Sequence, residues 1–226
     1  MRVIISVIWI ACFAACAGSE NKTKEVSMTG DTLSSSSQIQ ADIRKYILFF
    51  GNSLTAGYGL DEDQSFPSLI QDRIDSLKLP YQVINGGLSG ETSAGGLNRI
   101  DWVLRQQIDV FVLELGPNDA LRGLDLKSTE ANLRGILDEV LKKYPDIPII
   151  IAGMEAPPNM GAEYTSAFRK IFPTLANDYH AHLIPFLLDG VGGIPELNLP
   201  DRMHPNAEGQ KIVRENVWKV LKEVLK

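Results

Sequence analysis

After residue 45, hydrophobic residues fall into five short continuous runs, separated by longer segments in which they recur at helical spacing. The short runs are rich in Ile, Val, Leu and Phe, and they predict strands buried on both faces. These runs are residues 46–50, 81–85, 110–115, 147–153 and 182–186. The periodic segments predict helices over residues 66–77, 97–106, 129–144, 164–179 and 206–225.

The segment 129–144 has the clearest helical pattern. Its apolar residues form one stripe: Leu133, Ile136, Leu137, Val140 and Leu141. Ser128 or Thr129 is suited to cap its start, and Pro145 follows its end. Regular alternation of strands and helices favours a parallel sheet with helices on both faces, so we predict an α/β fold with three α/β/α layers.

The first residues of the chain are typical of export. Arg2 precedes an apolar run over residues 3–15, which is short for a membrane span and predicts a secretory signal peptide. Residues 13–16 resemble a bacterial lipobox, in which Cys16 would be lipidated and become the mature N-terminus. Ordinary cleavage after Ala15 or Ala17, which would release a soluble protein, is the alternative.

The next segment, residues 17–45, is poor in large apolar side chains and contains four consecutive serines at 34–37. Such a composition cannot offset the entropy of ordering the chain, and it predicts a flexible tether. We therefore divide the chain into a signal peptide with a lipobox (1–16), a tether (17–45) and one folded domain (46–226). This organisation predicts a bacterial envelope protein, lipid-anchored at the periplasmic or outer-membrane face.

Composition excludes several functions for the folded domain. Both cysteines, Cys12 and Cys16, lie in the export segment, which leaves no thiolate for catalysis or for a zinc site. With 28 acidic and 22 basic residues, the formal charge is −6 and no basic stripe is present. Nucleic acid is therefore an improbable partner.

Four polar motifs lie at or beyond the carboxyl ends of predicted strands. An α/β sheet binds its ligands at these ends. They are GNSLT (51–55), GGLSGET (86–92), ELGPND (114–119) and DRMHPN (201–206). Together they supply a hydroxyl, a histidine near a carboxylate and several hydrogen-bond donors. This is the equipment of an acyl hydrolase.

Ser53 is the candidate nucleophile, although a serine in such a place is by itself more typical of a turn or a cap. It does not lie in a GxSxG elbow, because Thr55 stands where the second glycine would be. Of the three histidines, His180 and His182 have no carboxylate motif beside them. His204 has Asp201 three residues earlier, a spacing at which the carboxylate can orient the imidazole towards Ser53.

The oxyanion of an acyl-transfer reaction needs hydrogen-bond donors. Gly90 can bring its backbone N–H close because it has no side chain, Asn118 offers a side-chain amide, and Ser53 offers its own backbone N–H. Taken singly, Gly90 is typical of a turn and Asn118 of a turn or cap. Their joint placement at strand ends favours the functional interpretation.

The four blocks resemble those of the SGNH hydrolases, also called the GDSL family. The runs GNSLTAGYG, SGETSAGG, ELGPNDALRG and HPNAEGQ are most similar to bacterial exported arylesterases, lysophospholipases and acyl-CoA thioesterases. This resemblance implies a flavodoxin-like five-stranded parallel sheet and no metal or cofactor. It also implies that Ser53 is the nucleophile, His204 the base and later the acid, and Asp201 the orienting carboxylate, with Ser53, Gly90 and Asn118 as the oxyanion hole.

The chain departs from the usual pattern of that family at four positions. Asn52 replaces the Asp of the family name and thereby loses a negative charge. Glu91 replaces a frequent Asp, and Pro117 replaces a frequent Gly or Ala. Arg202 replaces a frequent Gly between the two triad residues, where it can shape or cover the site.

Substrate preference must come from the loops. Tyr58, Leu60, residues 154–164 with Pro157, Pro158 and Met160, and residues 191–199 are candidates for the wall of an acyl pocket, or for core filling. We predict a serine esterase for aryl or short-to-medium acyl esters. A lysophospholipase or thioesterase and a carbohydrate acetylesterase are the enzymatic alternatives. The non-enzymatic alternative is a lipid-binding lipoprotein.

Overall fold

The computed structural model describes residues 44–225, and a parallel sheet forms their centre. Within this part of the chain the sheet has five strands in the order β2-β1-β3-β4-β5. Every neighbouring pair runs parallel. The strands are β1 (Lys45–Gly51), β2 (Tyr81–Gly87), β3 (Val110–Glu114), β4 (Ile149–Ala152) and β5 (His182–Ile184). The predicted five-stranded parallel sheet is thus confirmed.

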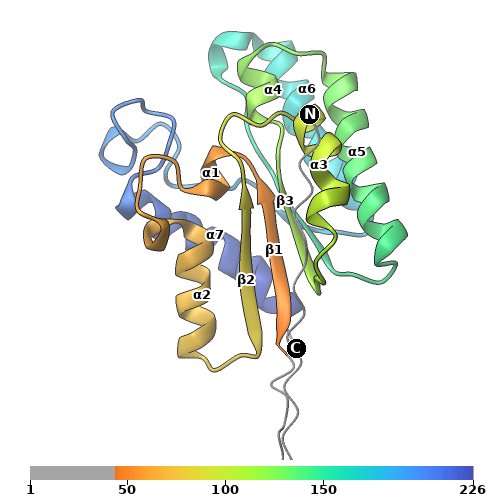
Figure 1. Cartoon of the computed structure of the whole chain (residues 1–226). Helices are drawn as coiled ribbons and strands as arrows, with labels where there is room; N and C mark the ends of the chain where they lie inside the picture. The colour runs from red at the N-terminus through yellow and green to blue at the C-terminus, as the bar shows by residue number, and fades with distance from the viewer. Residues whose placement is uncertain (1–43, 226) are drawn as a thin grey trace, which may run out of the picture. The chain divides into compact units, whose positions relative to one another are not determined.

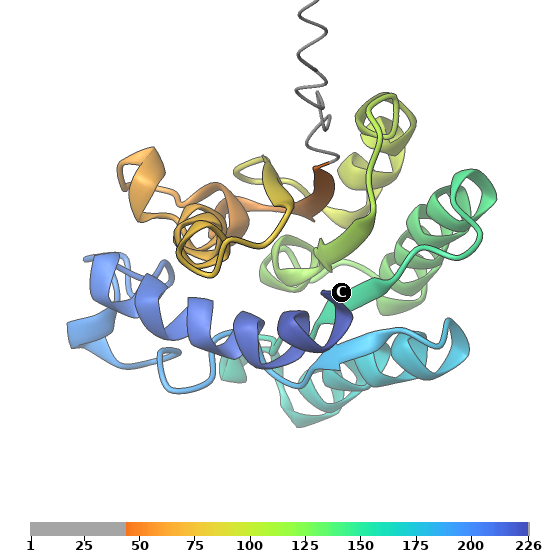
Figure 2. The ribbon, with the colours of Figure 1, turned by 90° about the horizontal axis from the view of Figure 1, so that it is seen from below.

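Helices cover both faces of this sheet. The long ones are α2 (Phe66–Ser76), α3 (Ser93–Val103), α5 (Leu126–Lys143), α6 (Ala162–Asp178) and α7 (Ala207–Val224). Helices α2 and α7 pack together on one face, whereas α3, α5 and α6 lie on the other (Figures 1 and 2). The three-layer α/β/α sandwich predicted from the alternation of elements is therefore confirmed.

The core explains why the strands read as continuous apolar runs. All of β3 is buried, and so are residues 47–51 of β1, because each of these strands is covered by helices on both sides. The side chains of Phe50 and Phe111 are fully buried from solvent. Helix α5 buries four residues of the predicted apolar stripe: Leu133, Ile136, Leu137 and Val140. This packing fixes where each strand ends, and so places the polar motifs.

Several predicted boundaries differ from the structure. The first strand starts at Lys45, so the predicted tether ends one position too late. Helix α3 begins at Ser93 rather than at 97, with the Thr92 side chain accepting the N–H of Gly95. Helix α5 begins at Leu126, and the predicted caps Ser128 and Thr129 were wrong. Asp125 is the N-cap, because its carboxylate accepts the N–H of Ser128.

Short helical segments complete the loops. They are α1 (Ser53–Ala56), α4 (Pro117–Leu121), η1 (Glu62–Gln64), η2 (Pro158–Met160) and η3 (Pro195–Leu197). Between residues 44 and 225, no helix is both long and apolar enough to cross a bilayer. The predicted signal peptide, the lipobox with Cys16 and nearly all of the predicted tether lie outside the described residues.

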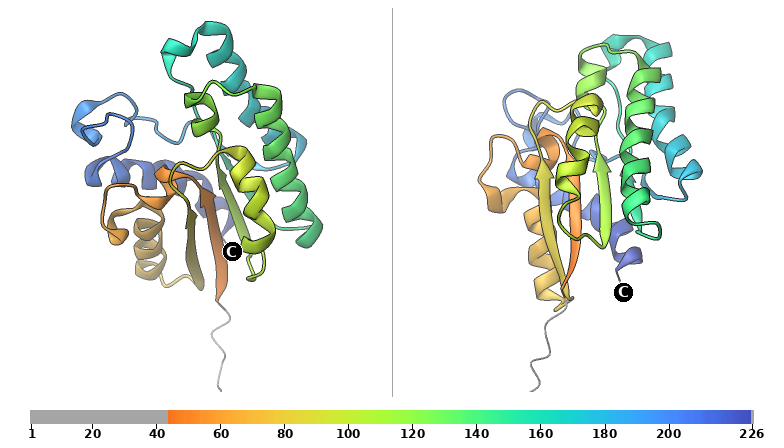
Figure 3. Two further views of the ribbon diagram at one scale, coloured as in Figure 1. Left: turned by 45° about the horizontal axis from the view of Figure 1, so that its top comes forward. Right: turned by 45° about the vertical axis from the view of Figure 1, so that its right-hand side comes forward.

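The strand order brings the polar motifs together. The chain passes from β1 to β2 on one side and then crosses to β3 on the other side of β1. Loops after strands that diverge in this way leave a crevice at the carboxyl edge of a sheet. Figure 3 shows β1, β2 and β3 pointing to the same edge, where α1 and α4 begin.

Candidate active site

The turn after β1 presents Ser53. Its preceding residue, Asn52, caps α1 by accepting the N–H of Leu54 at 2.9 Å through Oδ1. Gly57 ends this short helix in the left-handed conformation (φ 73°). The Ser53 side chain is thereby held on a rigid turn at the floor of a cavity, and the residue is 9% exposed.

Ser53, His204 and Asp201 form a continuous hydrogen-bonded chain. His204 Nε2 lies 2.8 Å from Ser53 Oγ, and His204 Nδ1 lies 2.6 Å from Asp201 Oδ2. A carboxylate facing Nδ1 favours the tautomer with the proton on that nitrogen, so Nε2 is left to accept the serine proton. The structure thus brings together the three residues that the sequence singled out.

The loop that carries His204 is itself well fixed. Asp201 Oδ1 accepts the backbone N–H groups of Met203 at 2.9 Å and His204 at 3.1 Å. Burial raises the pKa of the Asp201 carboxyl, but these bonds and the one to His204 outweigh it and hold the pKa below its usual value. Asp201 therefore stays ionised and can stabilise a protonated imidazole.

Arg202 occupies an unusual backbone conformation in this loop. Its φ is +60°, in the left-handed region that glycine adopts without cost. The frequent glycine at this position in similar proteins thus has a backbone reason. The Arg202 side chain also lines the cavity, as the sequence suggested.

The expected oxyanion donors surround the same space. Ser53, Gly90 and Asn118 all line the cavity. The sequence placed Asn118 at the end of a strand, but the residue lies on α4. There, one N–H of its side chain donates to Glu91 O at 2.9 Å. This bond leaves the second N–H of the amide for a ligand. Within residues 44–225, neither Ser53 N–H nor Gly90 N–H donates to a protein acceptor.

Gly90 is required for a different reason from the one expected. A Cβ at this position would meet no atom within 4 Å, so space does not demand a glycine. Its φ of +80° does, because other residues adopt that conformation only with strain. The glycine sets the direction of the loop and hence of its N–H.

The cavity has a volume of about 540 Å³ and a mostly apolar lining. Of the predicted wall, Tyr58, Met154, Pro157 and Pro158 line it, together with parts of the segment 191–199. Leu60 and Met160 are not among the lining residues, and Met160 instead lies near Gly123.

The structure also adds wall residues that the sequence analysis missed: Leu54, Leu121, Leu188 and Met203. Met203 lies between the two triad residues, a position that could have drawn attention to it. The Tyr58 ring, half exposed, packs on the His204 imidazole with 4.6 Å between ring centroids.

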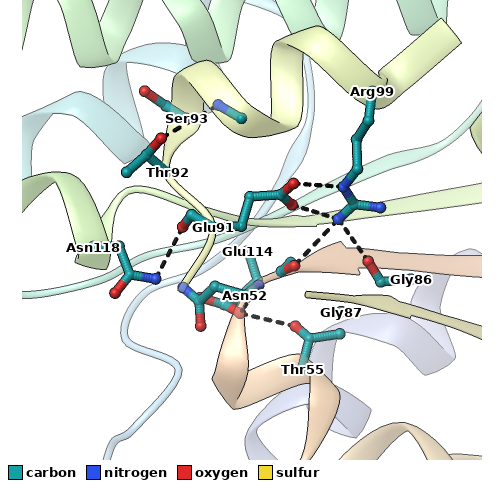
Figure 4. Close-up of polar contacts among 12 residues, drawn as sticks. Asn52, Thr55, Gly86, Gly87, Glu91, Thr92, Ser93, Arg99, Glu114 and Asn118 are labelled. Atoms are coloured by element: carbon teal, nitrogen blue, oxygen red, sulfur yellow. Dashed lines mark hydrogen bonds and ion pairs between the residues drawn. The ribbon is translucent and has the colours of Figure 1, made fainter. Parts of the chain in front are cut away.

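An ion pair between the buried Glu91 and the partly buried Arg99 supports the loop that carries Gly90 (Figure 4). Arg99 donates from Nε to Glu91 Oε1 at 2.6 Å and pairs through Nη2 with the other oxygen. Its guanidinium also donates to Gly86 O at 2.7 Å and lies 4.0 Å from the centroid of the Phe50 ring. Arg99 thus ties the loop after β2 to the sheet, a role that the sequence analysis missed.

A buried carboxylate supports the nucleophile turn. Glu114, the last residue of β3, accepts hydrogen bonds from Asn52 and Thr55. Burial raises the pKa of Glu114 to about 7, and the hydrogen bonds oppose that rise. In the sequence, Glu114 is recognisable only as the first residue of the motif ELGPND.

The remaining histidines lie elsewhere. His180 and His182 border a second hollow together with Asp146 and Glu223, beside the amino-terminal end of β5. In the described part of the chain, no group of three or more His, Cys, Asp or Glu side chains is placed to hold a metal ion.

Known proteins are similar to this chain in sequence and in fold. The model of the GDSL-like lipase/acylhydrolase family matches residues 49–212. Esterase TesA of Pseudomonas aeruginosa is 35% identical over 180 residues, covering 79% of this chain and 89% of that protein. An arylesterase of Vibrio mimicus is 36% identical over 172 residues, covering 76% and 85%.

A solved structure extends the likeness to three dimensions. AlinE4, described as an SGNH-hydrolase family esterase, superposes with a TM-score of 0.66 and 41% identity, covering 81% of this chain and 97% of that one. The family match spans most of the folded part and includes Ser53, Gly90, Asn118 and His204. The chain therefore belongs to the GDSL-like lipase/acylhydrolase family.

Proposed function

We propose that this protein is a serine carboxylic ester hydrolase that acts on aryl or short-to-medium acyl esters through an acyl-enzyme intermediate. The observation that carries the proposal is the unbroken path from Ser53 Oγ through His204 to Asp201, with contacts of 2.8 and 2.6 Å. Membership of an acylhydrolase family and the names of its esterase relatives support the reaction class.

In the first half-reaction, His204 Nε2 takes the proton of Ser53 as Oγ attacks the ester carbonyl carbon. The tetrahedral intermediate then collapses. The bond to the leaving oxygen breaks, and that oxygen takes the proton from His204. An alcohol or phenol departs, and the acyl group remains on Ser53. The ionised Asp201 stabilises the imidazolium that forms in between.

In the second half-reaction, His204 takes a proton from a water molecule that attacks the acyl-enzyme. Collapse of the new intermediate returns the proton to Ser53 Oγ and releases the carboxylic acid. In both steps the N–H groups of Ser53 and Gly90 and the free N–H of Asn118 would stabilise the oxyanion. Each such donor is worth about 10²- to 10³-fold in rate.

The cavity supports an apolar acyl or aryl group. It lies beside Ser53 and has a volume of about 540 Å³, and Leu, Met, Pro and Tyr side chains form its apolar wall. A lysophospholipase or thioesterase would use the same wall for a longer chain. A carbohydrate acetylesterase would need polar contacts for a sugar. The lining of this cavity is more apolar than polar, so it favours that substrate less.

A panel of nitrophenyl esters of increasing chain length, with acyl-CoA, lysophospholipid and acetylated sugars alongside, separates these substrates. We expect the highest kcat/KM on aryl or short-to-medium acyl esters. A preference for lysophospholipid or long acyl-CoA would support the first alternative, and activity confined to acetyl groups the second. Ser53→Ala should abolish all of these activities, whereas a wild-type protein that binds lipid without turnover would support the lipid-binding lipoprotein.

We further propose that the domain is exported and held at a bacterial envelope membrane by a lipid on Cys16. The support is the apolar run over residues 3–15 followed by the lipobox-like residues 13–16. Mass spectrometry of the mature N-terminal peptide tests this. We expect a lipid-modified Cys16 that is absent from Cys16→Ser, and an unmodified N-terminus after Ala15 or Ala17 would contradict it.

A further inference from the structure

Glu114 is bonded to both ends of the turn that presents Ser53. It is only 2% exposed, and its carboxylate accepts three hydrogen bonds. Asn52 donates its backbone N–H to Oε2 at 3.1 Å and its side-chain Nδ2 to Oε1 at 2.8 Å. Thr55 Oγ1 donates to Oε2 at 2.8 Å. The donors are therefore the residue before the serine and the second residue after it (Figure 4).

The orientation of the Asn52 amide follows from these contacts. Because Nδ2 faces a carboxylate, which can only accept, Oδ1 must face the other way. There Oδ1 accepts the N–H of Leu54 at 2.9 Å and lies 3.4 Å from Ser53 Oγ. Glu114 thus sets which end of the amide reaches the nucleophile turn.

We propose that Glu114 is a positioning residue, which acts through Asn52 and Thr55 to fix Ser53 within reach of His204. The proposal rests on the esterase function proposed above and adds a residue outside the triad and the oxyanion donors. Glu114 contacts neither substrate nor the reacting atoms. Its contribution is to the geometry of the turn.

The packing around the carboxylate is tight. A Cβ on Gly51 would lie 2.1 Å from Thr55 Oγ1 and 2.7 Å from Glu114 Oε2, so no side chain fits at that position. A turn packed this closely transmits a change at Glu114 to Ser53 directly. Misplacement of a reacting group by about 1 Å can cost about 10²-fold in rate.

Asn52 distinguishes this arrangement from one with the aspartate of the family name. An aspartate, the frequent residue in similar proteins, would place two buried carboxylate oxygens at the contact that is now 2.8 Å long. Two such groups can coexist there only by sharing a proton. With Asn52, one carboxylate and one amide satisfy each other, and the hydrogen bond from the amide favours the ionised form of Glu114 against the effect of burial.

The polar groups that face Glu114 come from a small set of elements. They are the backbone N–H and the side-chain amide of Asn52, from the turn, and the hydroxyl of Thr55, from α1. Arg99, on α3, contacts the adjacent Gly51 carbonyl at 3.4 Å, and His204 is linked to this region through Ser53. Among these groups, Asn52 controls whether the carboxylate needs a shared proton.

A double-variant cycle tests the proposal: wild type, Glu114→Gln, Asn52→Asp and the two combined. In Glu114→Gln, the new NH₂ must face either the Asn52 side-chain amide or the Asn52 backbone N–H, so two donors oppose each other. In the combined variant, the carboxylate introduced at position 52 accepts from that NH₂ and still accepts the Leu54 N–H. The donor and acceptor set is then complete again.

We expect Glu114→Gln to lower kcat about 10- to 100-fold on a nitrophenyl ester, with KM within about 3-fold of wild type. The combined variant should regain about 10-fold of that loss. Asn52→Asp alone should lose activity relative to wild type as pH rises, because its two carboxylates need a shared proton. Wild type and the combined variant should lack this alkaline loss.

Asp109→Asn is the matched control. Asp109 lies directly before β3, and its Oδ2 accepts the N–H of Tyr46 at 2.7 Å, at the other end of β1 from Ser53. This variant therefore also neutralises a carboxylate that is bonded to β1. It should leave kcat and the pH profile unchanged. Circular dichroism and thermal unfolding of every variant report separately on folding.

Additive effects of the two substitutions in folded proteins would overturn the proposal. If Glu114→Gln does not fold, Asn52→Asp and the combined variant decide. Equal activity of these two at alkaline pH would overturn the proposal, and higher activity of the combined variant would support it. Failure of the proposed function is distinguishable, because wild type would then show no Ser53-dependent turnover.

Discussion

His204 Nε2 lies 2.8 Å from Ser53 Oγ, although 151 positions separate the two residues along the chain. The contact joins the turn after β1 to the loop before α7. Both lie at the carboxyl edge of the sheet, because every strand of the described sheet runs in the same direction. The proposed esterase activity depends on that contact, because it lets His204 take the proton of Ser53.

Removing the charge of Asp201 should slow the reaction without weakening binding. Asp201→Asn no longer favours the His204 tautomer with the proton on Nδ1, and no longer stabilises the imidazolium. We expect kcat to fall about 10³- to 10⁴-fold with a small change in KM. Steady-state kinetics on a nitrophenyl ester measure this. Asp178→Asn, on the surface at an Arg134 pair, should retain full activity, and equal losses in the two variants would contradict the assignment.

The amide of Asn118 should contribute to the transition state more than to the stability of the fold. Asn118→Ala removes the bond to Glu91 O and the second N–H of an amide that lines the cavity. We expect kcat to fall about 10²- to 10³-fold. Gly90→Ala should lower kcat as well, because the φ of +80° at this position disfavours a side chain. If either variant kept wild-type kcat, it would remove that residue from the oxyanion hole.

The left-handed backbone conformation of Arg202 should lower the free energy of unfolding of the protein. The left-handed conformation costs a residue with a side chain about 1–2 kcal/mol. Glycine avoids this cost, but its greater freedom in the unfolded chain offsets part of the stabilisation. We therefore expect Arg202→Gly to raise the free energy of unfolding by up to about 1 kcal/mol relative to Arg202→Ala, which keeps the strain. Urea denaturation compares the two. A less stable glycine variant would show that φ is not the cause.

The Arg73–Glu215 pair predicts a pH dependence of stability away from the active site. The hydrogen bond from Arg73 to Glu215, with a smaller effect from Arg214, lowers the pKa of Glu215 to about 2. Because the pKa is lower in the folded state, the stabilisation is complete above the unfolded value of about 4.3 and is lost as pH falls towards 2.

Glu215→Gln should therefore be less stable than wild type at pH 7, and the difference should disappear near pH 2. Its size should stay below about 1 kcal/mol, because the pair is partly exposed and water screens it. Denaturation at a series of pH values measures the difference. A gap that grew on acidification would contradict the sign.

Much of the fold was predictable because parallel strands covered on both faces leave continuous apolar runs. This holds for β1 and β3, whose predicted and observed ranges nearly coincide. The start of α3 was missed because Ser93, Gly95 and Gly96 are weak helix formers and the apolar stripe begins only after them. The N-cap of α5 was misplaced because Asp, Ser and Thr within four positions can all cap a helix.

The site residues were predictable to the extent that they lie in short motifs. Ser53, Gly90, Asn118, Asp201 and His204 each stand in a recognisable block. Glu114 and Arg99 act through contacts between distant positions, and no local pattern reports them. Glu114 meets Asn52 across 62 positions, a proximity that follows only from the pairing of β1 with β3.

If Ser53 is the nucleophile, a covalent probe for serine hydrolases should react with its side chain. Wild-type protein is treated with a fluorophosphonate probe, digested and examined by mass spectrometry, with Ser53→Ala and His204→Ala treated in parallel. We expect one adduct on the peptide containing Ser53, none in Ser53→Ala and greatly slowed labelling in His204→Ala. Labelling of another residue in wild type, or ester hydrolysis that survives in Ser53→Ala, would contradict the assignment of Ser53 as the nucleophile.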